Sequence, residues 1–388
     1  MKLKRVLALV LSLAMVTACF AGCGKKDEGS GSGSDVFKIG GIGPTTGGAA
    51  SYGLAVKHGA ELAVKEINEA GGINGYKIEF KFEDDEHNPE KSVNAYNTLA
   101  DWGMQMLMGT VTSKPCTAVA AETANDNMFQ LTPSGSAVEC VEYDNAFRVC
   151  FSDPDQGKAS AQYIGENELA TKVGVIYDSS DVYSSGIYET FKKEAENQPF
   201  EIVAAESFTA DNKSEFSTQI EKIKEAGADL IFLPIYYQEA SLILNQAANV
   251  SYDVKFFGCD GLDGILGVEN FDTKLAEGVM LLTPFAADAK DEATQNFVKA
   301  YQEAYGEVPM QFAADAYDAI YIIKAAAEKG EVTPDMEVSD MCEAMKEAMV
   351  EIKVDGLTGA GITWSASGEP SKAPKAVVIK DGAYAAME

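Results

Sequence analysis

Residues 51–85 read SYGLAVKHGAELAVKEINEAGGINGYKIEFKFEDD, and this stretch decides the fold. Its first part predicts a helix over Tyr52–Ala70, because small and apolar residues recur at intervals of four, three and four and form one stripe. The glycines of GGINGY then end the helix. KIEFKFED alternates strictly between polar and apolar residues, which is typical of a strand with one buried face.

Strands and helices alternate on both sides of this stretch. VFKIGGIG, MQMLMG and FQLTP read as strands, with a helix from about Pro115 to Asn125 between the last two. Further along, KVGVIYD, FEIVAAESF, DLIFLPIYY, VKFFGCDG and GVMLLTPF are strand-like, and helices are expected between the first four. Two of those helices are predicted over Asp181–Gln198 and Lys213–Ala226, and two later ones over Asn296–Tyr305 and Ala313–Lys329. Strands that alternate with such helices predict parallel, doubly wound sheets.

The alternation occurs in two sets, on either side of a transition near Phe151 and Ser152. About 350 residues follow the N-terminal signal described below, which is too many for one compact core and suits two domains. We expect a first lobe of residues 36–151 plus about 285–355, and a second lobe of residues 152–284 plus about 356–388. The late helices then fold back onto the first lobe, so the chain crosses between the lobes more than once.

The N-terminus predicts export. A basic start, an apolar run from Val6 to Val16 and a small-residue region read as a signal peptide over residues 1–23, followed by a flexible linker over residues 24–35. A cysteine after small residues and before a Gly/Ser-rich spacer resembles a bacterial lipoprotein processing site. Cys23 is favoured as the acylated residue because it leads straight into the linker, and Cys19 stays open as the alternative. Such an anchor attaches a chain to the membrane without spanning it.

Composition excludes several classes of function. The chain is 46% hydrophobic and 23% charged, with a net charge of −29. The first 23 residues carry three positive charges and no acid, so the remainder carries about −32. A surface this acidic argues against nucleic acid as a partner. No segment after the signal approaches the 18 apolar residues of a spanning helix.

The chain offers little material for catalysis. It contains two histidines and two arginines, no GxxxxGK[ST] phosphate loop and no well-placed GxGxxG. Both histidines read as surface residues. The five cysteines beyond Cys23 show no metal-binding spacing and are odd in number, which favours buried thiols, although a bridge between Cys116 and Cys140 stays open. We therefore expect no enzyme, no metal, no cofactor and no catalytic residue.

Ligands of doubly wound sheets bind beyond the carboxyl ends of the strands. After MQMLMG, Ser113 is a natural N-cap and Pro115 suits a first helical turn. A helix start offers unpaired N–H groups and a positive dipole end, which suits a carboxylate. After FQLTP comes a second hydroxyl-rich turn, Ser134 to Ala137. Ordinary capping also explains both segments, and neither one alone indicates a ligand.

The second half supplies different groups at the same level. Tyr183 follows KVGVIYD, Tyr236 follows DLIFLPI, and Asp260 follows VKFFGC. A carboxylate there pairs with an ammonium, and tyrosines form walls for an apolar side chain. One lobe thus offers donors for an anion and the other a carboxylate for a cation. An α-amino acid carries both groups on one carbon.

These motifs resemble the branched-chain amino-acid-binding proteins, the extracytoplasmic receptors of ABC importers. The resemblance runs from about Phe37 to Asp381 and is carried by the quoted stretch, by GTVTSKPCTAV followed by LTPSGSA, and by VIYDSSDVYSSG, IYYQEA and FFGCDGL. It implies two Rossmann-like lobes joined by three hinge crossovers, the type I periplasmic binding fold. The ligand-binding residues that it implies are Ser113, Gly135, Ser136, Tyr183, Tyr236 and Asp260, with Tyr52 at the edge of the pocket. In this family the acid is usually Glu, and Thr is common where Ser136 stands.

The implied function is an extracytoplasmic solute-binding lipoprotein that binds a branched-chain or other apolar α-amino acid between its lobes. It is a monomer, tethered to the bacterial cell membrane, whose partners are the permease and ATPase subunits of an ABC importer. A receptor of the same fold that signals to a partner protein without transport stays open as the alternative. A cell-surface enzyme would need a nucleophile and a base, which the chain hardly offers.

Overall fold

The computed structural model describes residues 36–387. The predicted signal peptide, the linker and both candidate acylation sites, Cys19 and Cys23, lie outside these residues. None of the helices within the described part is long and apolar enough to cross a membrane.

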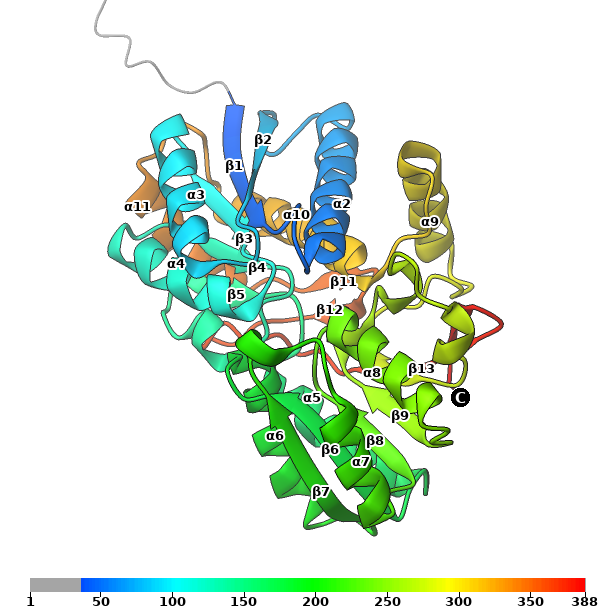
Figure 1. Ribbon diagram of the computed structural model, residues 1–388. Helices are drawn as coiled ribbons and strands as arrows, with labels where there is room; N and C mark the ends of the chain where they lie inside the picture. The colour runs from blue at the N-terminus through cyan, green and yellow to red at the C-terminus, as the bar shows by residue number, and fades with distance from the viewer. Residues whose placement is uncertain (1–35, 388) are drawn as a thin grey trace, which may run out of the picture. The chain divides into compact units, whose positions relative to one another are not determined.

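The first lobe is built on a five-stranded parallel sheet with the order β2-β1-β3-β4-β5. Its strands are β1 Val36–Gly43, β2 Lys77–Asp84, β3 Met106–Gly109, β4 Gln130–Thr132 and β5 Ala146–Arg148. Helices α2 (Ala50–Glu69) and α10 (Gln311–Lys329) cover one face, and α3 (Pro89–Trp102) and α4 (Ser113–Asn125) cover the other (Figure 1). The predicted β1 and β2 are confirmed at their stated bounds, and α2 starts and ends within two residues of its prediction.

Glycines explain why the quoted stretch packs as it does. On α2, a Cβ at Gly53 would lie 1.9 Å from the carbonyl oxygen of Pro44, and one at Gly59 would lie 2.1 Å from that of Ala313. These two positions therefore allow the helix to lie directly against the loop after β1 and against the backbone of α10. The Gly-x5-Gly-Ala pattern marks this close approach.

The second lobe is built on a seven-stranded sheet with the order β14-β13-β10-β9-β8-β6-β7. Its strands are β6 Lys172–Asp178, β7 Glu201–Phe208, β8 Leu230–Leu233, β9 Lys255–Gly258, β10 Met280–Thr283, β13 Lys375–Lys380 and β14 Ala383–Ala386. In β8, Leu230 and Phe232 pack in the core formed with α5 (Asp153–Glu166) and α6 (Val182–Ala195). Ile231 and Leu233 pack in the core formed with α7 (Ser217–Ala226) and α8 (Tyr237–Asn249). Helices therefore cover both faces, as predicted for a doubly wound sheet.

Two sequence expectations for this lobe differ from the structure. The predicted strand DLIFLPIYY ends at Leu233, because Pro234 has no N–H to donate to a neighbouring strand, and Tyr237 already begins α8. Strands β13 and β14 are antiparallel, whereas only parallel pairing was expected. A tight turn at Asp381 and Gly382, both with positive φ, joins them and imposes the antiparallel direction.

The chain passes between the lobes three times. It leaves the first lobe after β5, returns after β10 to α9 (Glu292–Tyr305), α10 and α11 (Val338–Met349), and leaves again after the hairpin of β11 (Val354–Gly356) and β12 (Gly359–Ile362). The hairpin stays with the first lobe, because Asp318 of α10 accepts hydrogen bonds from the N–H groups of Leu357 and Thr358, both at 2.9 Å. The chain joins the second sheet only at Lys375, later than the expected boundary near residue 356.

Candidate ligand site between the two lobes

The first lobe presents a cluster of hydroxyl groups where α4 begins. Thr112, not Ser113, is the N-cap residue, and its side chain makes no capping bond. Ser113 is instead the first helical residue, and its Oγ accepts hydrogen bonds from the N–H groups of Ser136 and Ala137, both at 3.2 Å. The predicted capping role of Ser113 is therefore wrong, because its hydroxyl bonds the neighbouring loop. These hydrogen bonds still join the start of α4 to the loop of residues 134–137, the two segments predicted from the sequence to face a ligand.

Arg148 holds the loop of residues 134–137 from behind. Its guanidinium, fully buried, donates to the carbonyl oxygens of Gly135 at 3.1 Å, of Ser136, and of Ala137 at 2.9 Å. Its Nε lies 3.2 Å from Oε2 of Glu369, on the third crossover. With three carbonyls turned toward Arg148, the opposite side of this loop faces the cleft.

The second lobe presents a carboxylate. Asp260 follows β9 and is 3% exposed, and its Oδ1 accepts a hydrogen bond from the hydroxyl of Tyr183 at 2.7 Å. Its own N–H donates to Gln156 at 3.1 Å. Burial raises the pKa of Asp260 to about 6, although the hydrogen bond from the Tyr183 hydroxyl opposes this. A carboxylate held in this way is stabilised by a cation placed against it.

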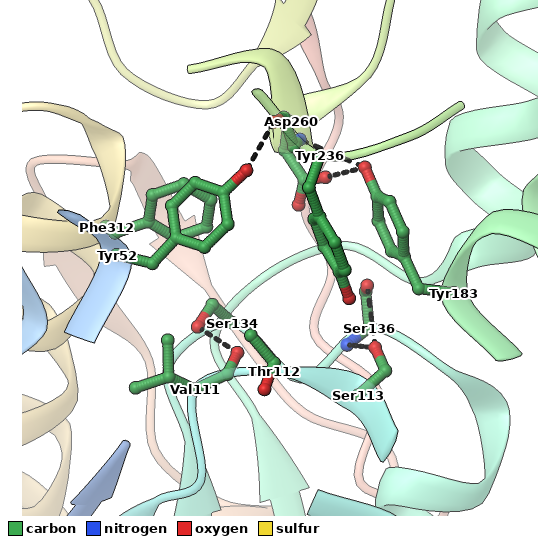
Figure 2. A pocket seen from close by; sticks show the side chains of 11 residues that line it. Tyr52, Val111, Thr112, Ser113, Ser134, Ser136, Tyr183, Tyr236, Asp260 and Phe312 are labelled. Carbon is green, nitrogen blue, oxygen red and sulfur yellow. Dashed lines mark hydrogen bonds between the residues drawn. The ribbon is translucent and has the colours of Figure 1, made fainter. Parts of the chain in front are cut away.

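Aromatic rings close the space between the two lobes. Tyr236 stacks on Tyr183 with ring centroids 4.8 Å apart, and its buried hydroxyl has no hydrogen-bond partner. Figure 2 shows that hydroxyl pointing toward Ser113 and Ser136. From the first lobe, the hydroxyl of Tyr52 donates to the carbonyl oxygen of Gly261 and accepts from the N–H of Tyr237 at 3.2 Å.

One cavity gathers most of these groups. It is lined by Tyr52, Val111, Thr112, Ser113, Ser134, Ser136, Tyr183, Tyr236, Asp260, Gly261 and Phe312 (Figure 2). Its volume is about 10 Å³, which suffices for about one water molecule. The side chains therefore nearly fill the cleft in this conformation, and a larger guest requires Tyr236 to move or the lobes to separate.

Six of the seven ligand-binding residues predicted from the sequence line this cavity, and Gly135 does not. The N–H of Gly135 donates to Oγ1 of Thr132 at 2.7 Å, so it is already paired. A Cβ at this position would lie 2.8 Å from Sγ of Cys116. Gly135 thus lets the loop lie against α4, which is a structural role.

His87 is expected on the surface from its sequence, but it lies at the cleft beside Thr112 and Tyr236. Its Nδ1 lies 2.8 Å from Oγ1 of Thr112, and its ring packs edge-on against Tyr236 at 5.5 Å. Burial, with the charges of Lys213 and Lys114, lowers its pKa to about 4, so the ring is neutral at pH 7. It follows β2 in an acidic loop, and no periodic pattern marks it as a cleft residue.

Further polar groups near the cleft are buried without a partner. Within residues 36–387 these include both carboxylate oxygens of Asp153 and Nε2 of Gln156, in addition to the Tyr236 hydroxyl. Burial also raises the pKa of Asp153 well above its usual value. Buried polar atoms are normally satisfied, and unsatisfied ones at a cleft indicate a place for a polar guest.

The chain matches a known protein family. The model of the periplasmic binding protein family matches residues 36–383. The chain belongs to this family. Type I periplasmic binding proteins act outside the cytoplasm and bind solutes without transforming them, so the chain is not an enzyme.

Individual relatives agree with this assignment. The periplasmic binding protein described here is 31% identical to the Leu/Ile/Val-binding protein homolog 3 of Brucella melitensis, over 76% of this chain and 80% of the relative. It is 29% identical to the leucine-, isoleucine-, valine-, threonine-, and alanine-binding protein of Pseudomonas aeruginosa, over 78% and 81%. The solved LivJ of Streptococcus pneumoniae, a branched-chain amino acid transporter substrate binding protein in complex with isoleucine, is 28% identical with a TM-score of 0.82, over 90% and 98%. The resemblance and the fold class expected from the sequence are confirmed.

Proposed function

We propose that this chain is the substrate-binding lipoprotein of an ABC importer and that it binds an apolar α-amino acid, branched-chain ones foremost, between its lobes. The observation that carries the proposal is that hydrogen-bond donors and a carboxylate lie on opposite sides of one cavity. Hydroxyl groups at the start of α4 lie on one side, and the buried carboxylate of Asp260 lies on the other.

The binding mode follows from this opposition. The carboxylate of the amino acid lies on the first lobe, where it accepts hydrogen bonds from the hydroxyls of Ser113 and Ser136 and benefits from the positive end of α4. The ammonium group lies against Asp260. The apolar side chain lies among Tyr52, Tyr236 and Phe312 and displaces the Tyr236 ring from its present position. Relatives named for leucine, isoleucine and valine support this choice of side chain.

Lobe closure depends on contacts that exist only when the lobes meet. Tyr52 of α2 bonds Gly261 and Tyr237 of the second lobe, and these bonds break when the cleft opens. An amino acid held from both sides adds further contacts to the closed state, and this differential affinity shifts the equilibrium toward closure. The permease recognises the closed monomer and takes up the amino acid.

A thermal-shift screen of the twenty common amino acids tests the proposal. A ligand that binds only the folded chain raises its melting temperature. We expect leucine, isoleucine and valine to raise it most, with Asp and Lys as charged negative controls. If none of the twenty raises the melting temperature, the proposed ligand class is wrong.

The lipid anchor needs its own test, because Cys23 lies outside the described residues. Cells that express the full chain are fed an alkyne-bearing fatty acid, and the chain is then checked for label. We expect Cys23→Ala to abolish labelling and Cys19→Ala, the matched control, to retain it. The reverse result would assign acylation to Cys19, and label in neither wild type nor variants would exclude the anchor.

A further inference from the structure

Two buried thiols lie directly behind the loop that carries Ser136. Cys116 is in the first turn of α4, three residues after Ser113, and Cys140 is in the short 3-10 helix Val138–Val141. The two side chains form a small core cluster with Ala137, and each is 0% exposed. The sequence leaves a bridge between them open, and the fold brings them together.

The two thiols interact with each other and with neighbouring polar groups. Nε2 of Gln130 donates to Sγ of Cys116 at 3.5 Å, and Sγ of Cys140 lies 3.6 Å from the carbonyl oxygen of Ser113. Burial raises the pKa of both thiols, but the hydrogen bond from Cys140, with those from Thr110 and Thr132, brings the pKa of Cys116 below its usual value.

The other described cysteines have no such neighbour. Cys150, Cys259 and Cys342 are also buried thiols, and the core clusters of Cys259 and Cys342 contain no second cysteine. Cys259 lies 3.6 Å from the hydroxyl of Ser160, and Cys342 lies within α11. Among the core clusters of residues 36–387, only the one of Cys116 and Cys140 contains two cysteines.

We propose that Cys116 and Cys140 are joined by a disulfide in the exported protein and that this bond fixes the hydroxyl-rich loop against α4. The family acts outside the cytoplasm, where disulfides persist. The oxidant is a protein or glutathione disulfide. The thiolate of one cysteine attacks one of its sulfurs, expels a thiol and forms a mixed disulfide, and the thiolate of the other cysteine then displaces the remaining thiol. One S–S bond forms from two thiols, and the oxidant disulfide is reduced to two thiols.

The burial of both sulfurs sets when the exchange occurs. An oxidant cannot reach them once the loop covers Cys116, so the bond forms while the chain folds after export. The bond closes a loop of 25 residues, from 116 to 140. Closing such a loop restricts the unfolded chain, and we expect the melting temperature of the oxidised protein to exceed that of the reduced protein by about 5 °C or more.

Thiol mapping tests the proposal directly. The denatured, reduced protein is refolded in a mixture of reduced and oxidised glutathione, or in excess dithiothreitol, and the remaining thiols are alkylated under denaturing conditions. We expect two fewer alkylated thiols in the first sample, and one cross-linked peptide that contains Cys116 and Cys140. Full alkylation of both samples, or a cross-link between any other pair, would overturn the proposal.

Matched variants separate the bond from general effects of oxidation. Cys116→Ser and Cys140→Ser should each remove the melting-temperature difference between the two samples, whereas Cys342→Ser should retain it. A difference that persists in Cys116→Ser would contradict the proposal. Should a serine variant fail to fold, peptide mapping of the wild-type chain still decides the matter. This test does not depend on the identity of the ligand.

Discussion

Asp260 is the residue on which the proposed recognition depends most. It is buried, and its hydroxyl partner Tyr183 is itself buried beneath Tyr236. Removing one partner of a buried charge pair typically costs about 2–5 kcal/mol. Asp260→Asn keeps the size of the side chain and an acceptor for Tyr183, so we expect it to weaken amino acid binding by about 30-fold or more. Calorimetry against the exposed variant Asp253→Asn measures this, and equal affinity in both variants would remove Asp260 from the site.

The pKa of Asp260 predicts how affinity depends on pH. Burial raises it to about 6 in the free protein, and a bound ammonium would keep the group ionised. A proton therefore competes with the ligand below pH 6, and affinity should fall by up to about tenfold per pH unit there while staying level from pH 7 to 8. In Asp260→Asn this dependence should disappear. Equal wild-type affinities at pH 5 and pH 7 would show that no ammonium binds this carboxylate.

Single residues near the cleft show what sequence could and could not predict. Tyr183, Tyr236 and Asp260 were found because each lies a few residues beyond the end of a strand, where ligand groups of a doubly wound sheet gather. His87 and Arg148 carry no periodic signal. Their roles arise from contacts with Thr112 and with three loop carbonyls, which only the folded chain brings near.

The loop of residues 134–137 is the element that shapes the anion side of the cleft, and Arg148 holds it. Arg148→Met keeps much of the side-chain volume but removes every donor and leaves Glu369 without its partner. Each buried carbonyl oxygen that loses its donor costs about 1–3 kcal/mol, so we expect a loss of at least about 3 kcal/mol in the free energy of unfolding, and weaker ligand binding as well. Urea unfolding and calorimetry measure the two effects.

A matched variant for Arg148 is Glu369→Gln, which leaves the three carbonyl bonds intact. We expect it to bind ligand almost as wild type does, because the loop keeps its donors. If Arg148→Met binds as tightly as Glu369→Gln, the loop does not depend on the guanidinium.

Elements with strong periodicity were predicted well, and their ends less well. The sequence patterns of α2 and α10 fit only a helix, and the strict alternation in β2 fits only a strand. The N-cap at Thr112 and the early end of β8 depend on local hydrogen bonding and on Pro234. The strands β13 and β14 were not predicted. They pair within the second sheet only after the chain has returned from the first lobe.

At the scale of the whole molecule, the segment by which the chain crosses between the lobes for the third time carries a buried lysine. Nζ of Lys372 lies 3.2 Å from Oδ1 of Asp315 on α10, and both side chains are 2% exposed. Burial raises the pKa of Asp315 to about 7, although the charge of Lys372 opposes this. Because this folded-state pKa lies above the unfolded one, the contribution of Asp315 to stability is lost as pH rises from about 4 through 7.

Lys372→Met should therefore destabilise the protein most at high pH. We expect a loss of about 3–5 kcal/mol in the free energy of unfolding at pH 8 and a smaller loss at pH 5, where Asp315 takes up a proton. Lys329→Met, which breaks an exposed pair with Glu351, should leave stability unchanged at both pH values. Urea unfolding at the two pH values checks this, and an equal loss at both would show that Asp315 stays ionised without Lys372.

The measurement that tests the central claim most directly is a calorimetric titration with leucine and with its two halves. 3-Methylbutylamine lacks the carboxylate, and 4-methylpentanoate lacks the ammonium group. If the first lobe binds the anion and Asp260 binds the cation, each analogue should bind at least about 30-fold more weakly than leucine. An analogue that binds as tightly as leucine would contradict the account.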